Sequence, residues 1–123
     1  MQAEATRAKE LAGLIERLEK ATGPDGAIDD LLYWTLKQHP AKGPFARIPA
    51  YTDSIDAALG LVERVLPGWM WYVGSVGEND MPQATITEPV EDCRDFVGHA
   101  PTAPLAILLA LLRALAQESQ DAQ

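Results

Sequence analysis

Few residues in this chain are of the types that do chemistry, and their spacing brings no reactive set together. The two histidines, His39 and His99, are far apart, and neither has a second His or Cys at metal-site spacing. Cys93 is the only cysteine, and with a histidine it could act as a nucleophile. However, the carboxylates of Asp92 and Asp95 oppose the charge of a reactive thiolate. We therefore interpret Cys93 as an incidental thiol, and we expect no catalytic residue, no metal and no cofactor.

Carboxylates and glycines also lack the spacing of a known site. One short segment holds four carboxylates: Glu88, Glu91, Asp92 and Asp95. Paired carboxylates can serve acid–base or calcium chemistry, but this spacing does not match a calcium loop. Gly74 and Gly77 are followed by neither a lysine nor a helix, as a phosphate loop requires. We interpret the acidic segment as a solvated surface loop.

A binding surface is the remaining candidate, and it would be built from aromatic residues and an arginine. Trp34 precedes a long proline-rich loop over 37–50, Arg47 lies within that loop, and Tyr51 ends it. Arginine beside aromatic rings suits anionic or planar ligands. Together with a sheet edge, the candidate binding surface would comprise Trp34, Arg47, Tyr51 and Trp71. Ordinary packing is the competing interpretation, because aromatic side chains bury large areas.

Composition favours one globular domain over residues 1–123. Hydrophobic residues make up 47% of the 123, enough to build a core without disulfides or metals. The formal net charge is -8, which argues against binding nucleic acid or an anionic membrane directly. The longest uncharged stretch, 98–112, is too short to span a bilayer. With an unpaired cysteine and no signal-peptide pattern at the N-terminus, we expect a cytoplasmic protein.

Hydrophobic periodicity predicts two helices in the first third of the chain. Gly23 and Pro24 end the first helix, and Asp25 caps the second. The short break between these helices predicts antiparallel neighbours. The expected apolar positions of the first helix are Leu11, Leu14, Ile15 and Leu18, and those of the second are Ile28, Leu31 and Leu32.

Two more helices are expected further along. Asp53 caps the third, whose buried stripe is Ile55, Ala58, Leu59, Val62 and Leu66. A turn follows at Pro67-Gly68. Thr102 caps the last helix, which has a second apolar stripe of Ile107, Leu111 and Leu115 and gives way to a frayed tail over 117–123. We expect a common core of Leu14, Leu18, Leu59, Val62, Trp69, Leu108 and Leu112.

Three strands are predicted between these helices, over 69–76, 84–88 and 95–99, with a hairpin turn over 77–80. The first strand is apolar on both faces, which indicates that both faces are at least partly covered. The expected fold class is α+β. A small antiparallel sheet of about three strands would be sandwiched between helices, in α/β/α layers.

The chain order and several local motifs resemble the phage ABA sandwich domain family, which comprises small proteins of phages and prophages. The matching pieces span nearly the whole chain: Leu14-Ile15-Glu16-Arg17-Leu18-Glu19, Ala21-Thr22-Gly23-Pro24-Asp25, Pro49-Ala50-Tyr51-Thr52, Ser54, Asp56-Ala57-Ala58-Leu59, Gly68-Trp69 and the Ala-Pro-Leu-rich last helix. The resemblance implies a single ABA-sandwich-like domain and a phage or prophage setting in a bacterial host cell. It carries over no catalytic residues.

Three functions remain open. The first is a non-enzymatic phage or prophage accessory protein that binds a macromolecular partner. The second is a counter-defence binder that sequesters a small nucleotide signal, with Lys42, Arg47 and Arg94 as the candidate cations. The third is an acidic nucleic-acid mimic that inhibits a host protein. The expected partner is a protein or a small anionic ligand, together with a second copy of the chain bound through the last helix or a sheet edge.

Overall fold

The α+β class and the antiparallel sheet are both confirmed. The computed structural model describes residues 2–36, 49–76, 81–91 and 93–121, so His39, Arg47, Asp92 and the loop over 37–48 lie outside the described residues. The described part forms four helices and one three-stranded sheet. Its elements are α1 (Gln2–Lys20), α2 (Gly26–Leu36), α3 (Ile55–Val65), β1 (Met70–Val76), β2 (Met81–Thr87), β3 (Asp95–His99) and α4 (Ala103–Asp121).

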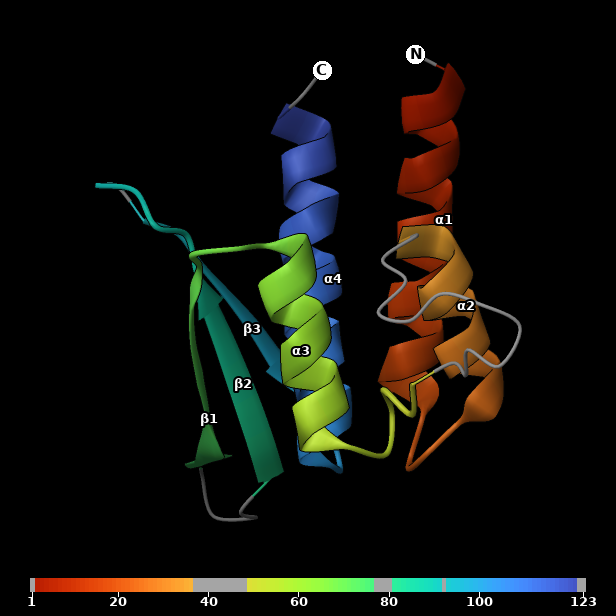
Figure 1. Ribbon diagram of the computed structural model, residues 1–123, viewed down its shortest axis with the longest axis vertical. Coiled ribbons are helices and arrows are strands. Elements are labelled where there is room, and N and C mark those ends of the chain that lie inside the picture. Colours follow the sequence, from red (N-terminus) through yellow and green to blue (C-terminus); the bar gives the residue numbers. More distant parts are fainter. Residues whose placement is uncertain (1, 37–48, 77–80, 92, 122–123) are drawn as a thin grey trace.

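The helix α4 is the centre of the molecule. It packs against β2 and β3 on one side and against α1 and α3 on its other sides, while α2 packs on α1 (Figure 1). The strands lie in the order β1-β2-β3. The layer order differs from the expected α/β/α, because no described helix covers the second face of the sheet. The sheet is instead the outer layer, with all four helices on one side of it.

The last helix is enclosed on every apolar side. Ile107, Leu111 and Leu115 are 1%, 0% and 6% exposed, so the expectation that this stripe could form an interface is wrong. Since α1 and α3 cover the sides of α4 that the sheet does not reach, both predicted stripes belong to the internal core. The helix continues to Asp121, through the region where a frayed tail was expected.

Most of the predicted core is confirmed. Leu14, Leu18, Val62, Leu108 and Leu112 are buried together, whereas Leu59 and Trp69 are only partly buried against them. Two further predictions are wrong. Leu31, in the middle of α2, and Ile55, the first residue of α3, are exposed, because each lies on a side of its helix that no described element covers.

Side-chain caps define the helix starts. The Asp25 carboxylate accepts hydrogen bonds from the Ala27 and Ile28 N–H groups (2.9 and 3.3 Å). The cap of α3 is Ser54 and not Asp53, because Ser54 Oγ is the oxygen that accepts from the Ala57 N–H. The predicted turn at Gly68 is confirmed by its left-handed backbone, with φ of 85°.

The register gives the sheet two different faces. One face packs on α4 and holds buried Ala84 and Ile86. On the same face, a side-chain carbon at Gly98 would lie 2.3 Å from the Ala106 carbonyl oxygen, so β3 runs against the backbone of α4. The outer face consists of the cross-strand rows Met70–Thr87–Asp95, Tyr72–Thr85–Val97 and Gly74–Gln83–His99. The alternation of β2 already indicates this sidedness, since Thr and Gln alternate with Ala and Ile.

Candidate functional site

The residues of the predicted binding surface are not brought together. Trp34 is 62% exposed on α2, and Trp71 is 44% exposed on β1. These two elements lie on opposite sides of the molecule, with α3 and α4 between them (Figure 1). Tyr51 is fully buried, and Arg47 lies outside the described residues. The described residues therefore offer two separate regions: a junction around Tyr51, and the exposed part of the sheet.

The junction around Tyr51 joins α2 to the segment before α3 through Thr52. Thr52 is 1% exposed, and its hydroxyl accepts a hydrogen bond from the Asp25 N–H (2.8 Å). The Thr52 N–H and hydroxyl both donate to Asp29 Oδ1, at 2.8 and 2.9 Å. Burial raises the pKa of Asp29 above its ordinary value, although the two bonds from Thr52 act in the opposite direction. This network holds α2 to the segment before α3, because the N–H and hydroxyl of Thr52 are both engaged with Asp29 Oδ1.

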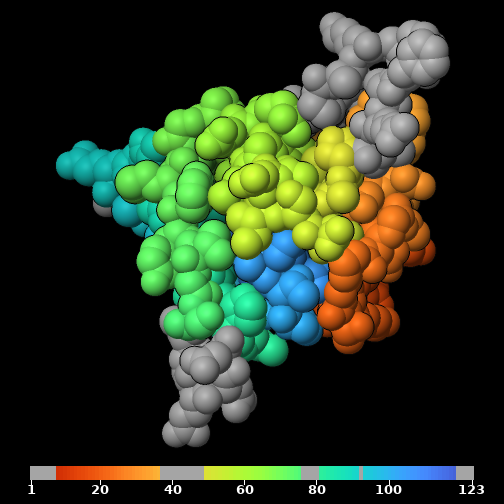
Figure 2. All heavy atoms as spheres, turned by 60° about the horizontal axis from the view of Figure 1, so that its bottom comes forward, coloured from red at the N-terminus to blue at the C-terminus, as the bar shows by residue number. Residues whose placement is uncertain are grey.

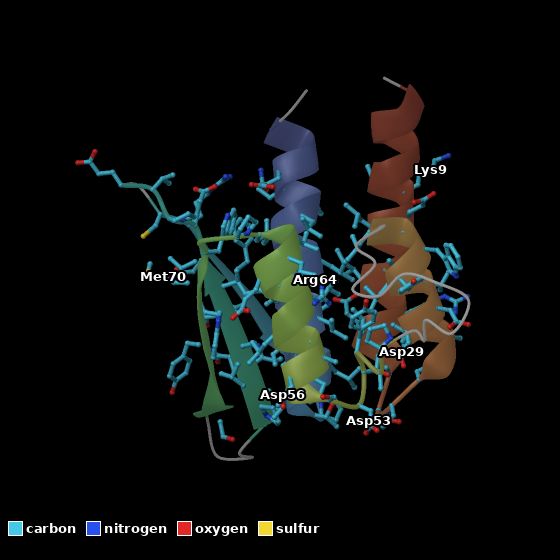
Figure 3. All side chains as sticks on the ribbon, viewed as in Figure 1. Lys9, Asp29, Asp53, Asp56, Arg64 and Met70 are labelled. Carbon is cyan, nitrogen blue, oxygen red and sulfur yellow. The ribbon has the colours of Figure 1, made fainter. Side chains whose placement is uncertain are left out.

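The Tyr51 hydroxyl is the most unusual polar group of this junction. It is buried and has no hydrogen-bond partner among the described residues. Arg64 of α3 acts on this hydroxyl through its charge and through a side-chain contact of hydrogen-bonding type, and Asp29 lies across from Arg64 on α2 (Figure 3). Burial raises the pKa of Tyr51, while the charge of Arg64 and its hydrogen-bonding contact lower it. A phenol held neutral in this way is a hydrogen-bond donor and not a nucleophile.

The exposed part of the sheet is the second region. Its outer face exposes three large apolar side chains: Met70 at 58%, Tyr72 at 61% and Met81 at 41%. Met70 projects from β1 away from the helices (Figure 3). Exposed apolar groups that gather on one face commonly mark a contact surface. The sequence predicts that both faces of this strand are at least partly covered, but within the part of the chain that the structure describes no element packs on the outer face, where Met70 and Tyr72 are mostly exposed.

Polar side chains continue this outer face across β2 and β3. Thr87 Oγ1 donates to Asp95 Oδ1 (2.8 Å), and His99 Nε2 donates to Gln83 Oε1 (2.8 Å). Because each bond joins a β2 side chain to its cross-strand partner on β3, these side chains form a fixed polar row beside the apolar residues of β1. The arrangement suits recognition of a surface with an apolar part and a polar part.

The acidic segment is anchored by an arginine. Arg94 forms a two-pronged ion pair with Glu88, at 2.7 and 3.2 Å, and its guanidinium lies 5.7 Å from the centre of the Phe96 ring. Phe96 in turn packs against Trp69, with ring centres 6.2 Å apart. Arg94, expected as a cation for an anionic ligand, therefore binds the protein's own carboxylate.

The direction of the backbone groups in the sheet follows from two bonds at the ends of β2. The Ala100 N–H donates to Pro82 O (3.2 Å), and the Glu88 N–H donates to Arg94 O (3.0 Å). Even-numbered residues of β2 therefore turn their backbone groups toward β3, and odd-numbered residues turn theirs toward β1. By the register, the even-numbered residues of β1 bond β2, and its odd-numbered residues face outward.

The two edges of the sheet consequently differ. On β1, the N–H and C=O groups of Trp71, Val73 and Ser75 face outward, and no described residue bonds them. On β3, the outward carbonyl of Val97 accepts a hydrogen bond from Arg113 of α4. Arg113 also pairs with Glu19 (3.2 Å), so side chains from two helices lie over the middle of that edge. Figure 2 shows β1 at the molecular surface beside α3.

Two further kinds of feature bear on function: a cluster of metal-binding side chains and a helix able to span a membrane. The described residues contain no group of three or more His, Cys, Asp or Glu side chains placed to hold a metal ion. Cys93 is exposed. Among the helices over the described ranges, none combines the length and apolar character needed to cross a bilayer.

Comparison with protein-family models finds no match to this chain, and neither does comparison with curated proteins or with solved structures.

Proposed function

We propose that this chain is a phage or prophage accessory protein, acting in the cytoplasm of a bacterial host cell by non-enzymatic binding to a macromolecular partner. The observation that supports binding is the outer face of the sheet, where Met70, Tyr72 and Met81 are exposed beside a fixed polar row. The phage setting rests on the family resemblance of the sequence. The net charge of -8 favours a protein partner over nucleic acid.

The two alternatives have weaker support. A binder of a nucleotide signal needs cationic donors, and Arg94 already pairs with Glu88, while Lys42 and Arg47 lie outside the described residues. A nucleic-acid mimic needs carboxylates spread along one face. On the exposed sheet face the described carboxylate is Asp95, which accepts a bond from Thr87.

Self-association is part of the same proposal. The two routes expected from the sequence are the last helix and a sheet edge. Because the apolar stripes of α4 are buried, the sheet edge is the route that we retain. A homodimer would use β1 and leave the outer face of each sheet available for the other partner.

The experiment is affinity purification of the tagged chain from phage-infected cells, followed by mass spectrometry of bound proteins and small molecules. A sheet-face variant combines Met70→Thr, Tyr72→Thr and Met81→Thr, since Thr retains strand propensity while removing the apolar surface. A matched control combines Leu31→Gln and Trp34→Gln, which remove exposed apolar groups on α2.

We expect one defined protein to bind the wild type and the α2 control but not the sheet-face variant, and to form the same complex when both components are purified. A partner that is lost only with the α2 control would contradict the assignment of the sheet face. Recovery of a nucleotide instead of a protein would replace the proposal with the counter-defence alternative.

A further inference from the structure

We propose that two copies of this chain pair through β1, antiparallel and with the two-fold axis at Val73, to form one continuous sheet. This inference rests on the proposed self-association and specifies its edge and register. It also gives the dimer a single large platform, because a two-fold axis perpendicular to the sheet places both outer faces on the same side.

The backbone of β1 is already arranged for such a pair. Trp71, Val73 and Ser75 carry the outward N–H and C=O groups, and no described residue bonds them. With the axis at Val73, Trp71 lies opposite Ser75 of the second copy, and Val73 lies opposite Val73. Each outward donor then meets an outward acceptor, and the full length of the strand takes part.

The side chains fit the same register, because large residues meet small ones. Trp71, with 44% of its surface exposed, lies opposite Ser75, and Tyr72 lies opposite Gly74. Tyr72 already leans over Gly74 of its own strand, since a side-chain carbon at Gly74 would lie 2.7 Å from the Tyr72 hydroxyl. In the dimer each tyrosine ring would cover the glycines of both strands, an arrangement that compensates for glycine in edge strands.

Charge favours a second copy as the occupant of this edge. The strand Met70–Val76 has no charged residue and no proline. Lysine and proline are the usual residues that keep an edge strand from pairing. A protein with net charge -8 repels its own copies in general, but this strand brings no like charges opposite each other. The edge of β3, by contrast, is closed by Arg113.

The first test measures mass by light scattering after gel filtration at tens of micromolar. Ser75→Pro removes an outward N–H of β1 without removing a bond to β2. His99→Pro is the matched control, because His99 also follows a glycine and also turns its N–H outward, on β3. We expect twice the chain mass for the wild type and for His99→Pro, and the mass of one chain for Ser75→Pro.

The second test fixes the register by disulfide formation in a Cys93→Ser background. Tyr72 and Gly74 of opposite copies would form a pair with Cα atoms about 4.5 Å apart, within reach of a disulfide. Mild oxidation of a mixture of Tyr72→Cys and Gly74→Cys chains should therefore give a cross-linked dimer, whereas neither variant alone should. This test decides the proposal if a proline variant does not fold.

The outcomes separate this inference from the proposed function. A wild-type monomer would overturn both the register and the homodimer, while leaving the partner found by affinity purification intact. A wild-type dimer that survives Ser75→Pro would overturn the β1 edge but keep the homodimer. Cross-linking of Tyr72→Cys alone would overturn the axis at Val73.

Discussion

The two edge strands, β1 and β3, are alike in sequence type but opposite in surroundings. Each is short and contains a glycine, Gly74 in β1 and Gly98 in β3. The backbone of β3 lies against α4 and its edge is closed by Arg113, whereas β1 has an outward edge that no described residue bonds. The comparison indicates that stability comes from the β3 side of the sheet and that β1 provides surface for contact.

The largest difference in the free energy of unfolding should come from removing an apolar side chain beside β3 and, in a second variant, one on β1. Leu109 on α4 is 2% exposed and lies beside Gly98 of β3. Leu109→Ala should lower the free energy of unfolding by about 2 to 5 kcal/mol, because it leaves a cavity. Met70→Ala on β1 should change it by no more than about 0.5 kcal/mol, since Met70 is exposed. Denaturant unfolding measures both, and equal losses would contradict the comparison.

The two glycines give the next largest contrast. A side-chain carbon at Gly98 would lie 2.3 Å from Ala106 O and 2.7 Å from Ala110 N, both backbone atoms of α4. Gly98→Ala must push β3 away from the helix and should cost about 1 to 3 kcal/mol or more. At Gly74 the close atoms belong to the Tyr72 ring, which can swing aside. Gly74→Ala should therefore be neutral within about 0.5 kcal/mol, as judged by thermal unfolding.

The features that the sequence predicts correctly are those set by residues close to each other in the chain. Asp25 and Thr102 cap helices as expected, and the strand over 95–99 has the expected bounds. Each of these features depends on neighbours within a few residues. The cap of α3 was assigned one residue early because Asp53 and Ser54 are both good capping residues, and only the geometry of the preceding turn selects Ser54.

Long-range packing accounts for what the sequence did not predict. Nothing within the strand over 70–76 shows whether other elements pack on one of its faces or on both, and its apolar composition favours both. The burial of Tyr51 depends on Thr52 reaching Asp25 and Asp29, more than twenty positions earlier in the chain. The candidate surface therefore separated into regions that the sequence could not place relative to each other, although the Thr and Gln alternation in β2 did signal an exposed face.

Removing the Arg113 side-chain bond to β3 should lower the free energy of unfolding by a smaller amount. Arg113→Met keeps the apolar stem of the side chain but removes its bond to Val97 O and its ion pair with Glu19. We expect a loss of about 1 kcal/mol, since the guanidinium is partly exposed. Glu19→Gln should cost less than about 0.5 kcal/mol, because the pair itself is solvated. If Arg113→Met forms species larger than the wild type in sedimentation, Arg113 protects this edge; if its stability is unchanged, the bond to Val97 contributes little.

The smallest change in the free energy of unfolding should come from Asp29→Asn, in the junction around Thr52 and away from both edges of the sheet. The pKa of Asp29 is raised by burial in the folded protein, so the contribution of this group to stability is greatest below its unfolded pKa of about 3.9 and is lost as the pH rises through the higher folded value. Asp29→Asn keeps the Oδ1 acceptor for Thr52 and has no charge to bury. Its stability relative to the wild type should therefore improve, by less than about 1 kcal/mol, as the pH increases from below 4 toward neutrality. Asp29→Ala serves as the control, because it removes the acceptor and should be less stable than Asp29→Asn by about 1 to 2 kcal/mol at every pH, since neither replacement titrates. Unfolding curves across this pH range give both differences, and a flat difference for Asp29→Asn would show that burial does not disfavour the Asp29 charge. Since α2 lies on the far side of the helical layer from β1, neither variant should change the oligomeric state.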